Sequence, residues 1–261
     1  MEVLQRPGGE LATRPIHFFW VVDCSGSMYG EKIGIVNNTI QECIPEMRSA
    51  ADNNPNAQLL IRALQFSSGA SWITSSPVPV EDYGWEDMDA NGLTELGKAF
   101  DLLAAQLSIP PMPERALPPV IVLLSDGQPT DDYKKSMDRL KKLPWFRKAV
   151  KIAISIGQDA DDEVLIEFTG NKELVLQANN ATALAKMIKW ASTTASMVSA
   201  PSSKPMNSVS TEATAATAPG TSAVASIPAD DPFAPANNGA PLVLDMSNIP
   251  NPDDFDEGAV W

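Results

Sequence analysis

The stretch that decides the fold is IHFFWVVDCSGSM, residues 16–28 of the 261-residue chain. Its first seven residues are apolar apart from His17 and rich in β-branched and aromatic side chains, as is typical of a strand buried on both faces. Small polar residues follow at once, from Asp23 to Ser27. Because ligands bind at the carboxyl ends of strands in open α/β sheets, this loop is the first candidate for a binding site.

Strand-like and helix-like segments alternate along the chain to about residue 195. Apolar residues recur every three or four positions in the predicted helices, whereas the predicted strands are short apolar runs. This alternation predicts an α/β fold with a doubly wound, mostly parallel six-stranded sheet, one antiparallel edge strand and helices on both faces. The predicted strands cover residues 16–22, 58–66, 70–74, 119–124, 149–156 and 173–177, and the predicted helices cover residues 33–47, 96–107, 134–143, 161–168 and 184–191.

Two residues are unusual within these segments. Pro45 lies inside the first predicted helix, where its missing N–H and its ring predict a kink or an early end of the helix. His17 lies near the start of the first strand, at the end away from the polar loop. We expect it to be a buried histidine whose ring is hydrogen-bonded.

Composition divides the chain into four parts. We expect an N-terminal extension over residues 1–14, a folded domain over 15–197, a low-complexity disordered linker over 198–240 and an acidic segment over 241–261. The linker is mostly Ala, Ser, Thr, Pro and Asn, which cannot bury enough apolar surface to offset the entropy of ordering. The last segment places apolar residues among acids, which suits either a short binding motif on a tether or a merely solubilising tail.

Charge and rare residues exclude several classes of function. The net charge is −14 at pH 7, which argues against nucleic acid as the main partner because phosphate binding needs clustered cations. One histidine and two cysteines argue against catalytic triads, His-rich zinc sites and a disulfide framework. Apolar runs are too short to span a bilayer and no signal-peptide pattern opens the chain, so we expect no membrane partner and a reducing cytoplasm.

Three predicted loops carry oxygen ligands toward the same edge of the sheet. The first contributes Asp23, Ser25 and Ser27, the second Thr94 and the third Asp126. Sets of carboxylates and hydroxyls select hard cations, so we expect Mg²⁺, or Mn²⁺ or Ca²⁺, at this edge. If the hydroxyls bind directly and the acids act mostly through water, the ion stays electrophilic and attracts a further carboxylate.

The spacing of these residues is similar to that of a known family. Asp-x-Ser-x-Ser at residues 23–27, a threonine 71 residues after Asp23 and an aspartate in Ser-Asp-Gly 32 residues later resemble the von Willebrand factor type A (VWA) domain with its metal-ion-dependent adhesion site. The resemblance covers about residues 14–195. It implies that Ser25 and Ser27 bind the ion directly, and that Thr94 binds directly or through water, depending on the state. The two aspartates would bind mainly through water.

The same resemblance implies a function. The chain would be a metal-dependent protein-binding scaffold or adaptor, and not an enzyme, that captures an acidic residue of a protein partner through the ion. Residues 6–28, 110–132 and 151–170 further resemble the bacterial tellurium-resistance-associated TerY-like branch. Members of that branch are encoded with a protein kinase and a metal-dependent serine/threonine phosphatase, which implies a place in a stress-signalling phosphorylation module with these partners.

Other interpretations of the same residues stay open. A metal-dependent phosphotransfer or hydrolytic enzyme would use the same ion, with Asp23 and Asp126 as its only candidate base or nucleophile. Asp23, Ser25 and Thr94 are also residue types of ordinary caps and turns. Residues 92–98 match the GxxxxGK pattern of phosphate-binding loops, but alanine follows where a hydroxyl residue would bind magnesium.

Two surface features allow a docking or a structural interpretation. The basic residues between 134 and 151 form either a solvated helix face or a dock for an acidic or phosphorylated peptide. Tyr83 and Trp85, in the long loop over residues 77–91, form either the rim of a partner surface or the contacts that pack this loop onto the domain.

Overall fold

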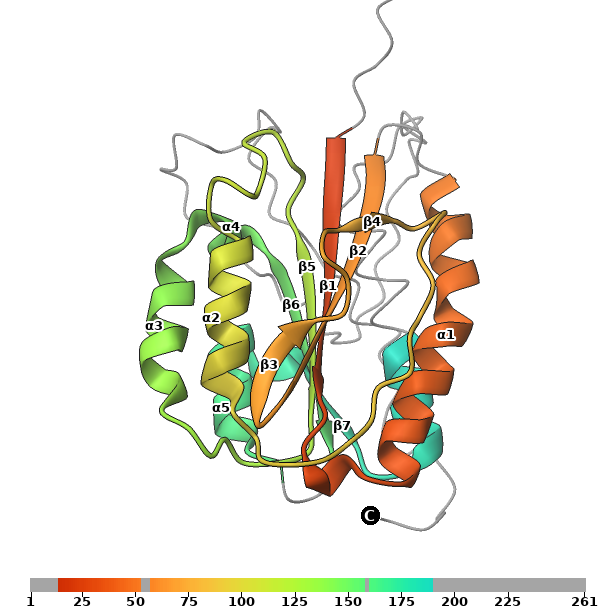
Figure 1. Ribbon diagram of the computed structural model, residues 1–261, viewed down its shortest axis with the longest axis vertical. Coiled ribbons are helices and arrows are strands. Elements are labelled where there is room, and N and C mark those ends of the chain that lie inside the picture. Colours follow the sequence, from red (N-terminus) through yellow and green to blue (C-terminus); the bar gives the residue numbers. More distant parts are fainter. Residues whose placement is uncertain (1–13, 53–56, 158–159, 190–261) are drawn as a thin grey trace, which may run out of the picture.

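Helices and strands alternate through the computed structural model, which describes residues 14–52, 57–157 and 160–189 (Figure 1). The strands are β1 Arg14–Asp23, β2 Ala57–Ser67, β3 Gly69–Trp72, β4 Val78–Pro79, β5 Val120–Ser125, β6 Val150–Ile156 and β7 Val175–Ala178. The helices are α1 Glu31–Asp52, α2 Leu96–Gln106, α3 Tyr133–Lys142, α4 Pro144–Lys148, α5 Asp162–Thr169 and a helix over residues 181–189, with short 3-10 turns η1 Gly26–Met28 and η2 Lys172–Leu174.

The strands form one mostly parallel sheet in the order β3-β2-β1-β5-β6-β7. Strands β1, β2, β5, β6 and β7 pair in parallel, and β3 pairs antiparallel with β2 at the edge. This confirms the predicted fold class and its six-stranded path with an antiparallel edge strand. The two-residue strand β4, which also pairs antiparallel with β2, was not predicted and makes the seventh strand.

Helices cover both faces of the sheet, and each face has its own apolar core (Figure 1). Helix α1 and the helix over residues 181–189 cover one face, while α2, α3, α4 and α5 cover the other. Strand β1 supplies both cores, because Phe18, Trp20 and Val22 alternate with Phe19 and Val21 and all five are fully buried. The central strand therefore places its carboxyl end rigidly between the two layers.

Pro45 does not end the first helix, so that part of the prediction is wrong. Helix α1 continues past Pro45 to Asp52, and Pro45 itself is exposed. Water can therefore satisfy the carbonyl that loses its partner. Buried residues on either side of the proline, Ile44 and Met47, keep the helix packed on the sheet. Tertiary packing thus overrides the local preference.

His17 is buried, as expected, with a side chain that is 4% exposed. The prediction that its ring is hydrogen-bonded is wrong, because neither ring nitrogen has a hydrogen-bond partner among the described residues. The ring instead stacks on Phe19, with ring centroids 5.8 Å apart. Burial lowers the pKa of His17 to about 4, so the ring is neutral at physiological pH.

The long loop before α2 is packed onto the domain, which decides between the two interpretations of its aromatic residues. Tyr83 is 2% exposed, and Trp85 donates a hydrogen bond from Nε1 to Asn37 Oδ1 over 3.1 Å. The same Asn37 side chain accepts from the backbone N–H of Met88 and donates to its carbonyl. Helix α1 therefore anchors the loop that leads to Thr94.

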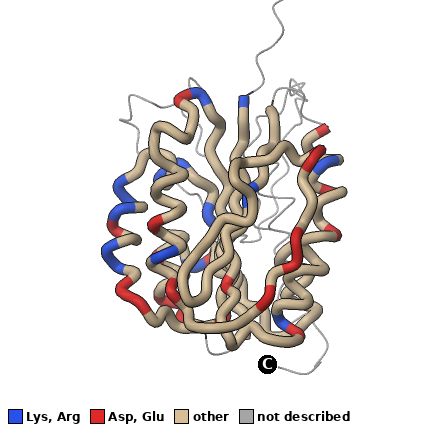
Figure 2. Tube along the Cα trace, viewed as in Figure 1, with Lys and Arg blue, Asp and Glu red and all other residues tan. Residues whose placement is uncertain are grey.

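Lysine and arginine residues gather along α3 (Figure 2). Several are paired with neighbouring acids: Lys135 with Asp132, Arg139 with Asp101 and Lys141 with Glu167. These pairs support the interpretation as a solvated helix face.

No described helix combines the length and apolar character that a membrane crossing requires. The predicted linker over 198–240 and the acidic segment over 241–261 lie outside the described residues, as do residues 1–13 of the predicted extension.

Candidate metal centre

The candidate site lies at the carboxyl edge of the sheet, where β1 and β5 end side by side (Figure 1). Asp23 is the last residue of β1, and the chain then turns through η1 into α1. Asp126 directly follows β5, and Thr94 lies just before α2. The predicted convergence of three loops on one edge is therefore present in the fold.

Backbone hydrogen bonds join these three loops to one another. The N–H of Gly26 donates to the carbonyl of Gly92 over 3.0 Å, and the N–H of Asn91 donates to the carbonyl of Cys24 over 2.8 Å. On the other side, the N–H of Thr130 donates to the carbonyl of Thr94 over 2.9 Å. The loops thus hold one another in place through main-chain contacts.

Gly92 is required by this arrangement. Its φ of +79° is in the left-handed region, and a Cβ there would lie 2.6 Å from Ser68 Oγ. Only glycine avoids both the backbone strain and this overlap. The position of Thr94, two residues later, therefore depends on Gly92.

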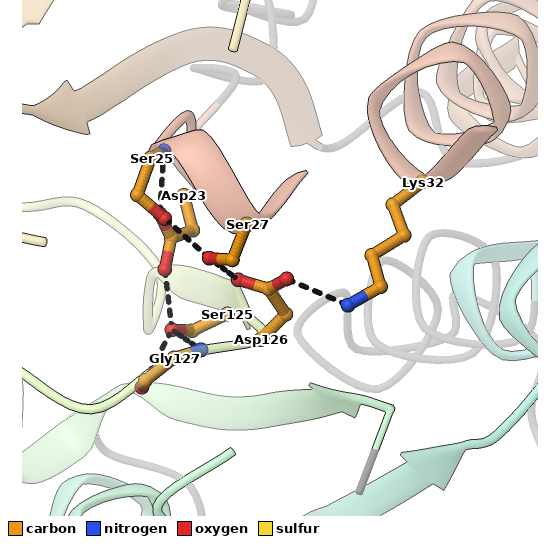
Figure 3. Close-up of polar contacts among 7 residues, drawn as sticks. All are labelled: Asp23, Ser25, Ser27, Lys32, Ser125, Asp126 and Gly127. Carbon is orange, nitrogen blue, oxygen red and sulfur yellow. Dashed lines mark hydrogen bonds and ion pairs between the residues drawn. The ribbon is translucent and has the colours of Figure 1, made fainter. Parts of the chain in front are cut away.

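Hydroxyls and carboxylates from the first and third loops form a continuous chain of contacts (Figure 3). Ser25 Oγ lies 3.0 Å from Ser27 Oγ, and Ser27 Oγ donates to Asp126 Oδ1 over 2.7 Å. Asp23 is held from two sides: its Oδ1 accepts from the Ser25 N–H over 2.9 Å, and its Oδ2 accepts from Ser125 Oγ over 2.6 Å. The Asp23 carboxylate is therefore fixed behind the two hydroxyls.

The second loop brings the hydroxyl of Thr94 to the same place. A Cβ built on Gly127 would lie 3.4 Å from Thr94 Oγ1 and 3.6 Å from Ser27 Oγ, so both hydroxyls face the same side of Gly127. Five residues predicted from the sequence thus converge: Asp23, Ser25, Ser27, Thr94 and Asp126.

Most of these side chains are buried, although the site opens to solvent. Asp23 and Asp126 are 0% and 1% exposed, and Ser25 and Thr94 are also buried, whereas Ser27 is exposed. Burial raises the pKa of Asp23, which means that its surroundings disfavour the charge. A cation at this edge would relieve that penalty.

Cys24 lies between two candidate ligands but points into the core, as expected. Its Sγ lies 3.7 Å from Met88 Sδ, and the residue is 3% exposed. Burial raises the pKa of the Cys24 thiol to about 12. It is therefore a neutral, apolar residue at neutral pH and no thiolate ligand.

Sequence reasoning missed one charged residue of the site. Lys32, in the first turn of α1, places Nζ 2.7 Å from Asp126 Oδ2, and the side chains of Lys32 and Asp126 are 18% and 0% exposed (Figure 3). A lysine at a helix N-terminus faces the positive end of the helix dipole, which is unfavourable. That position was the available signal that Lys32 has a specific anionic partner.

The GxxxxGK pattern has a structural role here. The backbone N–H groups of Gly97 and Lys98 donate to the Asp131 carboxylate, over 3.0 and 3.3 Å. These are the groups at the start of α2 that a phosphate would need. Asp131 from the third loop therefore occupies the place of a bound phosphate.

The donor set fits a hard divalent ion. Three hydroxyls and the Asp126 carboxylate face one another at hydrogen-bond distances or around Gly127, and the Asp23 carboxylate is held beside them by the Ser25 N–H. None of the five side chains offers a nitrogen or sulfur donor. Within residues 14–52, 57–157 and 160–189, no group of three or more His, Cys, Asp or Glu side chains is placed to bind a metal, so this site relies on hydroxyls beside its two carboxylates. Oxygen donors of this kind suit Mg²⁺, Mn²⁺ or Ca²⁺.

Comparisons with known proteins agree with this architecture. The family model described as the von Willebrand factor type A domain matches residues 19–190. A search of curated proteins gave no match.

Similar solved structures share the fold at low sequence identity. The ArnB paralog VWA2 from Sulfolobus acidocaldarius is 17% identical with a TM-score of 0.51, over 68% of this chain and 45% of that one. Proximal thread matrix protein 1 from the mussel byssus, with a zinc-occupied MIDAS motif, is 18% identical with a TM-score of 0.50, over 71% and 46%. The pilus adhesin SpaC from Lactobacillus rhamnosus GG is 14% identical with a TM-score of 0.53, over 66% and 29%. The chain thus spans less than half the length of each.

Proposed function

The chain belongs to the von Willebrand factor type A domain family, and on that basis we propose that it is a metal-dependent protein-binding module. One observation carries the proposal: hydroxyls and carboxylates far apart in sequence meet at the carboxyl edge of the sheet. The zinc-occupied MIDAS motif of the mussel byssus protein supports a divalent ion in the same kind of fold.

The ligand roles proposed for the five residues are those that the resemblance to the VWA family implies. Ser25, Ser27 and Thr94 would bind Mg²⁺, Mn²⁺ or Ca²⁺ with their neutral hydroxyls, Thr94 directly or through water depending on the state. The more deeply buried carboxylates of Asp23 and Asp126 would act mainly through water. Neutral direct ligands leave the ion electrophilic, and the ion then supplies a coordination position for a partner's carboxylate.

The surface around the site supports a protein partner. Four large apolar side chains are strongly exposed in the described part of the chain, and two of them flank the site: Tyr29 at 80% and Leu93 at 56%. Tyr29 directly follows η1, and Leu93 precedes Thr94. We therefore expect the partner to present its acidic residue beside a bulky apolar side chain.

The wider setting is a proposal from the resemblance to the TerY-like branch. There the module would be a scaffold in a bacterial stress or tellurium-resistance phosphorylation system, with a protein kinase and a metal-dependent phosphatase as partners. A reducing cytoplasm suits the two buried cysteines, which are both free. The acidic segment over 241–261 would serve as a further binding motif on the linker over 198–240.

Metal binding is tested by urea unfolding with and without Mg²⁺ or Mn²⁺. Ion at 100 times its dissociation constant should add about 2.7 kcal/mol to the free energy of unfolding. The substitution Asp23→Asn keeps the size of the side chain and should abolish this gain, while metal-free stability is unchanged or higher because a buried charge is removed. Asp138→Asn, on the exposed face of α3, is the matched control and should keep the full gain.

An equal gain in wild type and Asp23→Asn would refute the site. Partner capture is tested by affinity purification with and without a chelator. Proteins that belong to the site should be lost on chelation and also with Thr94→Val, which removes one hydroxyl at nearly constant volume. Proteins retained in both cases would count against ion-mediated capture.

A further inference from the structure

We propose that Lys32 is a built-in counter-charge of the ion site, one that lowers affinity for the ion and keeps the loaded site electropositive toward an anionic partner group. The inference rests on the proposed function, because it concerns the same ion. It assigns a role to a residue that lies outside the five metal ligands predicted from the sequence.

The contacts of Asp126 carry the proposal. One carboxylate oxygen accepts from Ser27 Oγ over 2.7 Å, and the other lies 2.7 Å from Lys32 Nζ. The Asp126 side chain is 0% exposed, so bulk solvent screens its charge less than that of a surface carboxylate. The ammonium and the ion would therefore share one carboxylate, each through its own oxygen.

Lys32 is held at this place from more than one side. A Cβ built on Gly157, directly after β6, would lie 3.4 Å from Lys32 Nζ. The ammonium is thus confined between Asp126 and the carboxyl edge of β6, with its side chain only 18% exposed. The first turn of α1 is an unfavourable place for a cation, and the contact with Asp126 offsets that cost.

Because of Lys32, the net charge of the site would become positive, and not merely zero, when a divalent ion binds. Asp23, Asp126 and Lys32 together leave one net negative charge, which a divalent ion would convert to one net positive charge. Without the ammonium, two carboxylates would neutralise the ion completely. Lys32 therefore weakens the attraction for the ion and strengthens the attraction of the loaded site for a carboxylate.

The test compares Mn²⁺ binding by calorimetry in the full chain and its variants. Lys32→Gln keeps a hydrogen-bond donor without the charge and should bind Mn²⁺ at least about tenfold more tightly, as expected for a unit charge removed near a divalent ion. Lys32→Arg keeps the charge and should bind like wild type. Lys134→Gln, at an exposed lysine of α3, is the matched control and should also bind like wild type.

A second measurement follows the anion. Acetate added to the Mn²⁺-loaded protein, monitored by water proton relaxation, should bind more weakly to Lys32→Gln than to wild type. If Lys32→Gln binds Mn²⁺ no more tightly, or acetate no less tightly, the role of Lys32 is overturned and the ion site stands. If wild type and Asp23→Asn both fail to bind Mn²⁺, the proposed function is overturned as well.

Discussion

The single histidine of the chain should make the fold sensitive to acid. Burial lowers the pKa of His17 from 6.5 to about 4. Above pH 6.5 His17 binds no proton in the folded or the unfolded chain, so its titration takes nothing from the free energy of unfolding. As the pH falls from 6.5 to 4, only the unfolded chain binds it, and the free energy of unfolding decreases.

The magnitude follows from the size of the shift. A difference of one pKa unit corresponds to about 1.4 kcal/mol, so the shift of His17 should remove about 3 kcal/mol between pH 6.5 and 4. This is a large part of the roughly 5–15 kcal/mol that stabilises most domains. Below pH 4 the part of the loss that is due to His17 should cease, since the folded state then also binds the proton at this ring.

The assay is urea unfolding of wild type and His17→Leu at a series of pH values, with a chelator present throughout. Carboxylates titrate in both proteins, so the difference between the two curves isolates His17. The variant should lose less stability on acidification, and at pH 7.5 it should be at least as stable, because two unpaired ring nitrogens are removed. Parallel curves for the two proteins would refute the reasoning, as would an imidazole resonance that titrates near pH 6.5.

Two further substitutions test contacts that position the loops of the site. Gly97→Ala places a Cβ 2.7 Å from Asp131 Oδ2 and 3.0 Å from Tyr133 Cα. It should lower the free energy of unfolding, measured in urea, by about 1–3 kcal/mol. The control Gly34→Ala, where a Cβ meets nothing within 4 Å, should leave this free energy unchanged or raise it. Asn37→Ala removes the three hydrogen bonds that hold Met88 and Trp85. It should lower the free energy of unfolding by about 3 kcal/mol and make amide hydrogen exchange at residues 83–90 faster. Unchanged exchange at these residues would contradict the anchoring role of Asn37.

The fold was predictable because its central strands are nearly pure apolar runs. The strand that contains Phe18 and Trp20 is buried on both faces, and the sequence pattern of such strands is distinctive. The convergence of Asp23 and Asp126 was predictable for the same reason, since β1 and β5 are parallel and end at one edge. Thr94 follows no parallel strand, and backbone contacts of its loop bring it to this edge. The two-residue strand β4 has no periodicity to detect, so pairing geometry alone reveals it.

The failures concern residues whose state depends on distant neighbours. Pro45 opposes helix formation locally, yet α1 continues because Ile44 and Met47 pack on the sheet. His17 was expected to find a hydrogen-bond partner, but its neighbours on this face of the sheet are apolar, among them Phe19. Local rules state a preference at each of these positions, and the packing of the whole domain decides the outcome.

The missed contacts of the site have a common physical consequence. Asp131 caps the start of α2, and the Thr130 N–H holds the carbonyl of Thr94, so the third loop positions the second. Lys32 in turn holds Asp126 of the third loop. Because these contacts do not involve an ion, the loops need little ordering when an ion binds, and the binding free energy is not spent on loop entropy. Substitutions at Asp131 and Lys32 should therefore change ion affinity by different routes, the first through loop order and the second through charge.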